Sequence, residues 1–313
     1  MGNKYMGTEW FAAFCLNIEE VLWYKGIGEE AVNMNHQIPE KVLNDGTKVP
    51  VIGFGTAGLK GADGVKVIAA AIDAGYRLID TAFNYENEGA VGKAVQQSSI
   101  PREELLICSK LPGRRHAYQE AIVTIEESLY RGGLDYYDLY LIHWPNPQID
   151  RYVEAWQALI EAKKRGYIRS IGVCNFLPEH NERLIRETGI APSINQVELH
   201  PLFNQEHQRT KDAEQGIVTE SWSPLGRGHS MMENEEIGNI AAAHGKTATQ
   251  VILRWHIQLG AIPIPKASSV KHQTENLDIF DFELSPEEMN VISALSREDG
   301  RLWDQDPNSY EEL

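Results

Sequence analysis

The stretch VIGFGTAGLKGADGVKVIAAAIDAGYRLIDT, residues 51–81, decides the fold class, because two short strand-like runs flank one amphipathic segment. Residues 51–55 and 77–81 have the length and composition of strands. Between them, VKVIAAAIDAG has apolar residues at every third or fourth position and ends on Gly75, a pattern typical of a helix with a glycine stop. A strand, a helix and a second strand in this order predict a parallel βαβ unit.

The same alternation continues down the chain. Six further runs resemble strands, with helix-like segments between them, and they lie at residues 105–110, 137–143, 168–173, 193–197, 217–221 and 261–265. Eight parallel strands joined by crossover helices close a barrel, so the sequence predicts an α/β protein with the (β/α)8 fold of a TIM barrel.

A hairpin is expected before the first of these strands. The pair Asp45-Gly46, within KVLNDGTKVPV, is a strong signal for a two-residue turn between two short strands. We expect this N-terminal β-hairpin to plug one end of the barrel.

Two extra helices and a tail also lie outside the eightfold pattern. A helical pattern covers residues 232–244, and a second helix opens at Ser285, where Pro286 and Glu288 complete the signature of a capped N-terminus. The tail GRLWDQDPNSYEEL, residues 300–313, has no periodicity, and we expect an ordered loop there.

The composition of the 313 residues is that of a water-soluble globular protein. A formal net charge of −16 disfavours general binding to nucleic acid or to membrane surfaces, which are polyanions held by clustered Lys and Arg. No apolar run reaches the roughly 18 residues that a membrane helix needs. Three cysteines, Cys15, Cys108 and Cys174, show no metal-binding spacing and suit a reducing compartment. We therefore expect a cytoplasmic protein, and a monomer because no exposed apolar helix is evident.

The N-terminus stands apart from the barrel pattern. Residues 1–36 contain no clear strand signal. Their apolar stretch WFAAFCL is too short for a signal peptide, and acidic residues follow it. Met34 is an alternative start. We expect residues 1–36 to be an extension that is either not native or poorly ordered, with residues 37–313 forming a single domain.

Polar side chains accumulate where the predicted strands end. Asp80 ends the second strand, Tyr85 lies on the following loop, Lys110 ends the third strand and His143 ends the fourth. In a (β/α)8 barrel the carboxyl ends of the strands converge on one face, which carries the active site. Each residue alone is more often a cap, a packing residue or a surface residue, so their joint placement carries the prediction.

The four side chains together suit proton transfer to a carbonyl oxygen. A tyrosine with an ordinary pKa of about 10 is a weak acid at neutral pH unless a neighbour favours its ionised form. We expect Lys110 to do so for Tyr85, and Asp80 to pair with the buried ammonium. His143 would donate a hydrogen bond to the carbonyl oxygen, where negative charge develops.

From about residue 38 onward the chain resembles the aldo-keto reductase family, in particular bacterial diketogluconate and small-aldehyde reductases. The resemblance rests on GFGT at 53–56, on DTA at 80–82 followed by Tyr85, and on LDYYDLYLIHWP at 134–145. It implies that Asp80, Tyr85, Lys110 and His143 form a catalytic tetrad, with Tyr85 as the general acid. It also implies reduction of aldehydes, ketones or dicarbonyls to alcohols by hydride transfer from NAD(P)H.

The resemblance extends to a cofactor site, through GVCNF at 172–176, NQVELHP at 195–201, SWSPLG at 221–226 and the loop from Lys266. The cofactor-binding residues it implies are Thr56, Asp80, Cys174, Asn175, Gln196, Trp222, Ser223, Leu225, Gly226, Lys266, Ala267, His272, Glu275 and Asn276. The family commonly has Ser at the position of Cys174 and of Ala267, and Arg at that of His272. Since Arg is the better partner for a 2′-phosphate, we expect NADPH as cofactor with unusual tolerance of NADH.

Substrate contacts are expected from Phe54, His143, Trp144 and Trp303. Ala57 and Pro112 stand where relatives often have Trp, so the pocket should be more open. We expect a small-molecule carbonyl substrate and no metal.

Two other classes of protein remain as alternatives. A barrel that has lost catalysis and regulates a partner through bound nucleotide would lack part of the tetrad, and all four residues are present. A metal-dependent barrel hydrolase could use Asp80 and His143 as ligands, but the sequence has no paired-His motif or ligand cluster.

Overall fold

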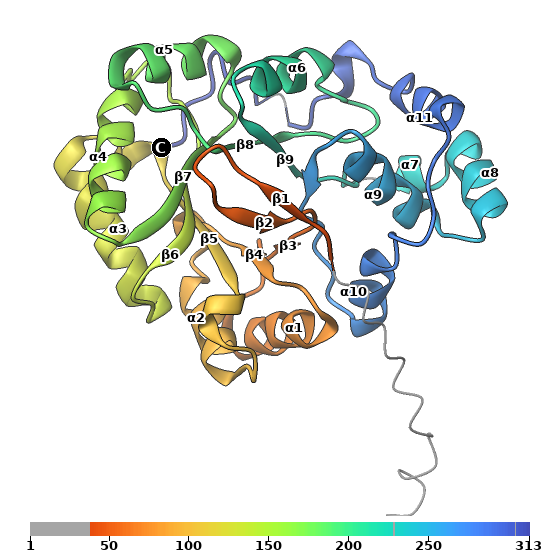
Figure 1. The fold of residues 1–313 in the computed structure, drawn as a ribbon, viewed down its shortest axis with the longest axis horizontal. Helices are drawn as coiled ribbons and strands as arrows, with labels where there is room; N and C mark the ends of the chain where they lie inside the picture. Colours follow the sequence, from red (N-terminus) through yellow and green to blue (C-terminus); the bar gives the residue numbers. More distant parts are fainter. Residues whose placement is uncertain (1–37, 228, 304) are drawn as a thin grey trace, which may run out of the picture. The chain divides into compact units, whose positions relative to one another are not determined.

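Eight parallel strands form the centre of the structure, a computed structural model in which residues 38–227, 229–303 and 305–313 are described. They are β3 (Phe54–Gly55), β4 (Leu78–Asp80), β5 (Leu106–Leu111), β6 (Tyr137–Ile142), β7 (Ile168–Cys174), β8 (Ile194–Glu198), β9 (Val218–Trp222) and β10 (Ile262–Pro263). Neighbours in the sheet follow the order of the chain. The N–H groups of Gly53 and Gly55 donate to the carbonyl oxygens of Pro263 and Pro265 at 3.0 and 3.1 Å, which joins the first strand to the last. The predicted (β/α)8 barrel is confirmed (Figure 1).

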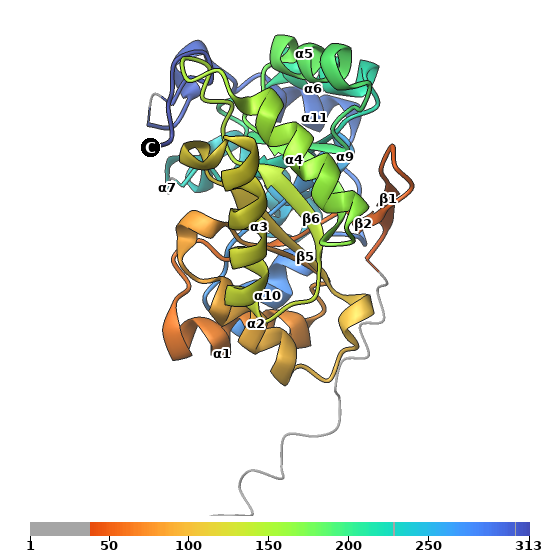
Figure 2. The same cartoon turned by 90° about the vertical axis from the view of Figure 1, so that its left-hand side faces the viewer.

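Helices cover the outside of the strands, as Figure 2 shows for α3 and α4 beside β5 and β6. The barrel helices are α1 (Gly61–Ala74), α2 (Glu88–Gln97), α3 (Tyr118–Gly132), α4 (Tyr152–Lys164), α5 (Pro178–Thr188), α6 (Glu206–Glu214), α9 (Ala248–Gln258) and α10 (Val270–Leu277). None of the helices in the described ranges is long and apolar enough to cross a membrane.

Both extra helices are present as predicted. They are α8 (Glu235–His244), preceded by the four-residue α7 (His229–Met232), and α11 (Pro286–Ser293). At the start of α11 the hydroxyl of Ser285 accepts a hydrogen bond from the Glu288 N–H, and the Glu288 carboxylate accepts one from the Ser285 N–H. This reciprocal capping box satisfies two N–H groups that the helix itself cannot pair.

The predicted hairpin forms from β1 (Glu40–Val42) and β2 (Lys48–Pro50) and lies across the ring of strands in Figure 1. Leu43 and Val49 are buried among apolar side chains that point into the barrel, so the hairpin plugs this end. Its turn is longer than predicted. The Leu43 N–H donates to the Thr47 carbonyl at 2.8 Å, which leaves three residues in the loop, and Gly46 takes the left-handed conformation (φ +87°) that closes such a loop.

The domain boundary at residue 37 concerns a segment outside the described residues. Ile38–Leu313 forms one compact unit. The expectations for the N-terminal extension stay predictions.

Candidate active site

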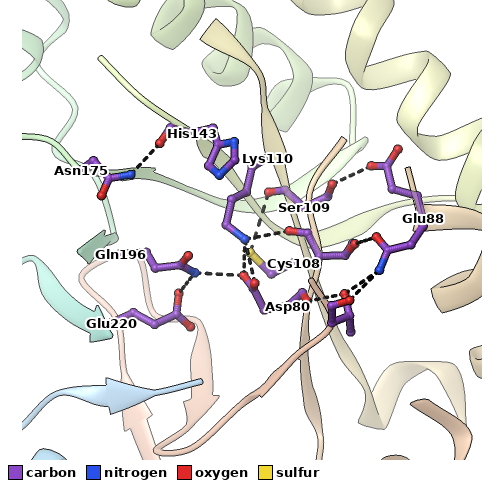
Figure 3. Close-up of polar contacts among 12 residues, drawn as sticks. Asp80, Glu88, Cys108, Ser109, Lys110, His143, Asn175, Gln196 and Glu220 are labelled. Carbon is purple, nitrogen blue, oxygen red and sulfur yellow. Dashed lines mark hydrogen bonds and ion pairs between the residues drawn. The ribbon is translucent and has the colours of Figure 1, made fainter. Parts of the chain in front are cut away.

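A buried ion pair lies at the carboxyl ends of β4 and β5 (Figure 3). The ammonium of Lys110 donates to both carboxylate oxygens of Asp80, at 2.7 and 2.6 Å, and to the carbonyl of Thr81 at 2.8 Å. Burial alone would lower the pKa of Lys110, but the charge of Asp80 offsets this, and the pKa lies well above its ordinary value. Lys110 is therefore a permanent cation with no ammonium N–H left for another partner.

Tyr85 ends the short 3-10 helix η2 (Phe83–Tyr85), directly beyond β4. The Lys110 ammonium lies 5.2 Å from the centre of its ring. Although part of the residue remains accessible, burial of the phenol raises the pKa of Tyr85 to about 12. Lys110 acts in the opposite direction, but Asp80 adds to the increase. We expected Lys110 to make Tyr85 more acidic. The charge of Lys110 does lower the pKa of Tyr85, but burial raises this pKa further, so the net pKa is higher than the ordinary value and the expectation is wrong for the net pKa.

His143 follows β6 and faces Tyr85, with the two ring centres 5.9 Å apart and the rings nearly perpendicular. Its Nδ1 lies 2.7 Å from Oε1 of Glu312, in the C-terminal tail. The carboxylate oxygen stands off the direction of the ring N–H, so the contact acts through charge more than through an aligned hydrogen bond. Glu312 was not predicted from the sequence, because no motif in the aperiodic tail links it to His143.

Asn175, a predicted cofactor residue, connects a second one, Trp222, to His143. Its amide donates to the carbonyl of His143 at 3.0 Å and accepts from the indole N–H of Trp222 at 2.7 Å. Asn175 has a φ of +61°, a left-handed conformation that Asn tolerates better than most residues. The strand ends thus hold the imidazole, a carboxamide and an indole together.

Gln196 lies deeper and joins two carboxyl groups. Its amide donates to Asp80 at 2.9 Å and to Glu220 at 2.6 Å. Burial, followed by the charge of Asp80, raises the pKa of Glu220 to about 8. Glu220 is a further buried acid that was not predicted, since a single Glu within a strand pattern gives no signal of its position.

The predicted phosphate and adenine residues follow β10. Lys266 is exposed, and its ammonium donates to the carbonyl of Ala57 at 3.0 Å. Ser269 caps α10 by accepting from the N–H of His272, whose side chain is exposed. Glu275 pairs with Lys271 at 3.6 Å on the same helix. A lysine beside a helix N-terminus fits a phosphate, since both carry positive charge.

Several of the predicted site residues are buried and have little or no surface for a ligand. Phe54 is fully buried, with its ring 5.2 Å from that of Tyr76, among side chains that lie between strands and helices. It is therefore not a wall of the pocket in this structure. Thr56 is fully buried and donates to the carbonyl of Asp80. Cys174 and Ala267 are also core residues.

The two predicted tryptophans pack differently. Trp144 is buried, with its ring 4.4 Å from that of Tyr310 in the tail. Trp303 is 55% exposed and lies parallel to Trp222, with ring centres 6.2 Å apart and planes 9° from each other. Ser223, Leu225 and Gly226 form the turn after β9, and Asn276 is buried in α10.

Together the fold and the site define a class of enzyme: a (β/α)8-barrel reductase with a phenol, an imidazole and a lysine–aspartate pair at the strand ends. The model of the aldo/keto reductase family matches residues 51–297. This chain belongs to that family and is an NAD(P)H-dependent oxidoreductase that reduces carbonyl groups.

Individual relatives cover nearly all of the described domain. A protein named 2,5-diketo-D-gluconic acid reductase B, from a Corynebacterium species, is 50% identical over 276 residues, which are 88% of this chain and 99% of that protein. An aldo-keto reductase of Mycolicibacterium smegmatis is 45% identical over 272 residues, which are 87% of this chain and 98% of that protein.

Two solved structures are also similar. An aldo/keto reductase from Brucella melitensis superposes with a TM-score of 0.79 at 42% identity, over 82% of this chain and 99% of that one. A mutant of Gox0644, solved in complex with NADPH, superposes with a TM-score of 0.83 at 41% identity, over 87% of this chain and 98% of that one.

Proposed function

We propose that this enzyme uses NADPH to reduce aldehydes, ketones and dicarbonyls, with Tyr85 as the proton donor. The observation that carries the proposal is the convergence of Tyr85, the Lys110–Asp80 pair and His143 at three adjacent strand ends. Bound NADPH would supply the hydride that reaches the carbonyl carbon. The side chains of the protein would bind and orient the carbonyl and deliver the proton.

Each member of the tetrad has a separate task. The imidazole of His143 orients and polarises the carbonyl oxygen. The phenol of Tyr85 gives that oxygen its proton as the alkoxide forms, and the fixed charge of Lys110 stabilises the phenolate left behind. Asp80 keeps Lys110 charged and in place, because it binds two of the three ammonium hydrogens.

The cofactor would lie across the remaining strand ends. Trp222 offers an aromatic face for the nicotinamide, and Asn175 and Gln196 offer carboxamides for its amide group. Lys266 and the N-terminus of α10 would hold the 2′-phosphate. Trp303 covers Trp222 at present, so stacking of the nicotinamide on that face requires Trp303 to move aside.

A dicarbonyl sugar acid is the substrate class we propose first. The support is the 50% identity to the relative named 2,5-diketo-D-gluconic acid reductase B, together with small Ala57 and Pro112 at two positions that would otherwise narrow the pocket. We also propose a cytoplasmic location, in keeping with the free thiols of Cys108 and Cys174, and a monomer. Light scattering on the purified protein measures the oligomeric state directly.

The decisive experiment is Tyr85→Phe, assayed with a reactive aldehyde and with NADPH binding followed by fluorescence. Loss of the hydroxyl should abolish reduction and leave NADPH affinity within about twofold, since general acid catalysis alone contributes roughly 10²–10⁴-fold. Tyr130→Phe is the matched control, because Tyr130 is 76% exposed on α3. Equal losses of reduction and of NADPH binding would mean that Tyr85 has been assigned the wrong task.

A further inference from the structure

We infer that Glu312, the penultimate residue of the chain, is a positioning residue that orients His143 and keeps a proton on its Nδ1. The inference rests on the proposed role of His143 at the substrate carbonyl. It assigns a function in catalysis to the C-terminal tail.

One carboxylate contacts the three loops that carry the catalytic side chains. Oε1 of Glu312 lies 2.7 Å from His143 Nδ1 and accepts a hydrogen bond from the amide of Asn84, also at 2.7 Å. Oε2 accepts from the backbone N–H of Gly113 at 2.8 Å. Asn84 directly precedes Tyr85, and Gly113 follows the strand that ends with Lys110 and Leu111. Glu312 therefore links the loops that follow β4, β5 and β6.

The backbone of the tail is held equally firmly. The side chain of Asn146 accepts from the Glu312 N–H and donates to the Glu312 carbonyl, both at 3.1 Å, and Asn146 is fully buried. A Cβ on Gly113 would meet the Asn146 side chain at 2.4 Å, so glycine is required for this close approach. Trp144 packs on Tyr310 beside the same contact. Glu312 is thus placed by a built site and not by chance contact at a chain end.

The side chain of Glu312 is negatively charged at neutral pH. Burial alone would raise the pKa of Glu312, but the charge and contact of His143, with the hydrogen bonds from Gly113 and Asn84, hold it at about 2. A carboxylate 2.7 Å from Nδ1 would repel a lone pair there, so Nδ1 carries the proton. The ionisable groups that feel the charge of Glu312 are Tyr85, His116, Cys174 and Tyr310.

This proton has a consequence for the other ring nitrogen. A neutral imidazole with its proton on Nδ1 presents a lone pair at Nε2 and repels a carbonyl oxygen. With a proton held on Nδ1, the ring donates from Nε2 only when Nε2 carries a second proton. By placing a negative charge beside Nδ1, Glu312 supplies the counter-charge for a ring that donates from both nitrogens, so that Nε2 binds the carbonyl oxygen and stabilises the alkoxide that develops on it.

The experiment compares Glu312→Gln with Glu311→Gln in the full-length enzyme. Glu311 is the matched control, because it is also a tail glutamate that accepts a backbone hydrogen bond, from Gln148, but does not contact His143. Steady-state kinetics with NADPH and an uncharged aldehyde give kcat and KM, and ¹⁵N-histidine labelling reports the protonation of the His143 ring by NMR. His143→Ala and Tyr85→Phe are measured alongside.

Glu312→Gln should lower kcat by about tenfold to a hundredfold, the range known for carboxylates that orient metal-binding histidines, with NADPH affinity within about twofold. The ¹⁵N signals of the His143 ring should shift, because Nδ1 loses its contact with a carboxylate. Glu311→Gln should match the wild type in both. Glu312→Asp, which keeps the charge on a shorter side chain, should recover part of kcat.

Two outcomes would overturn the inference. One is an unchanged kcat and ¹⁵N spectrum in Glu312→Gln, even if its melting temperature falls, since the tail would then be a structural anchor only. The other is a loss of kcat with the ¹⁵N signals of the His143 ring unchanged. If His143→Ala and Tyr85→Phe retained full activity, the proposed function would fail instead, so the two failures are distinguishable.

Discussion

The ammonium of Lys110 lies 2.6 and 2.7 Å from the two carboxylate oxygens of Asp80, and both side chains are almost completely shielded from solvent. A buried ion pair of this kind is costly to break from one side, because the remaining charge has no water to solvate it. The first prediction follows from this contact.

Asp80→Asn should lower the free energy of unfolding by about 3 to 5 kcal/mol, since it leaves the Lys110 ammonium buried without its counter-charge. The double variant with Lys110→Met should be more stable than Asp80→Asn alone, and both should have lost reduction. Urea unfolding gives the free energies. The exposed pair of Asp63 with Lys66 is the control, and Asp63→Asn should change stability by no more than about 0.5 kcal/mol. Additive effects of the two buried substitutions would contradict the coupling.

Tyr85 should remain protonated throughout the ordinary alkaline range, because burial raises its pKa to about 12 in the enzyme without substrate. Its protonated form is the active one in reduction. Activity should therefore fall through ionisation of Tyr85 only as the pH approaches that value. Ultraviolet difference titration of the wild type against Tyr85→Phe measures this one tyrosine, and a midpoint at or below about pH 10, the ordinary value, would refute the prediction.

Glu220 should make the wild-type fold less stable as the pH rises from about 5 to 8. Burial raises its folded-state pKa to about 8, so the unfolded chain releases this proton at a lower pH than the folded chain does. The contribution is complete below the unfolded pKa of about 4.5 and declines by up to about 1.4 kcal/mol per pH unit above it. Glu220→Gln, which cannot ionise, should flatten this part of the stability profile. Equal pH slopes for the two proteins in urea unfolding would contradict the assignment.

The cofactor preference should be moderate in the wild type. With His272 at the position of an Arg, NADPH should be favoured over NADH by less than about a thousandfold in kcat/KM, or about 4 kcal/mol. His272→Arg should raise this ratio by about tenfold through a charge-assisted bond to the 2′-phosphate. His207→Arg on α6 adds the same charge at another exposed site and should leave the ratio unchanged. A wild-type ratio above the stated limit would refute the prediction.

The contact of α2 with α3 should not tolerate a methyl group at Gly92. A Cβ there would lie 1.7 Å from the carbonyl oxygen of Gly132, so Gly92→Ala requires the two helices to separate. We expect a loss of at least about 2 kcal/mol in the free energy of unfolding, the middle of the range for overpacking. Gly238→Ala on α8 has open space around its Cβ and should be neutral or slightly stabilising. Thermal unfolding of both variants and of the wild type measures these differences in stability, and an unchanged melting temperature in Gly92→Ala would contradict the prediction.

Local patterns were enough to predict the strands, the two extra helices and the placement of Asp80, Tyr85, Lys110 and His143 at the strand ends. Strand and helix periodicities are properties of short segments, and a barrel brings the ends of its strands together wherever they lie in the chain. The number of residues in the hairpin loop was less predictable, since Asp45-Gly46 occurs in turns of more than one length.

Whether a single side chain points into the barrel or outward was harder to predict. Phe54 stands between Gly53 and Gly55, and strand alternation places neighbours on opposite faces. A Cβ on Gly53 would meet Leu78 and Ile264 inside the barrel, at 3.0 and 2.8 Å. Phe54 therefore points outward to Tyr76. The short motif alone does not show which residues of the strand point inward, because this depends on the register of the strand.

By itself the sequence determined the barrel and placed Asp80, Tyr85, Lys110 and His143 at its strand ends, because each assignment depends on neighbours within a few residues. The tertiary structure alone decided the contact of Glu312 with His143 and the acidity of Tyr85 and Glu220. Those properties depend on which groups from distant segments exclude water from a side chain or bring a charge to it, and only the packed barrel sets these distances.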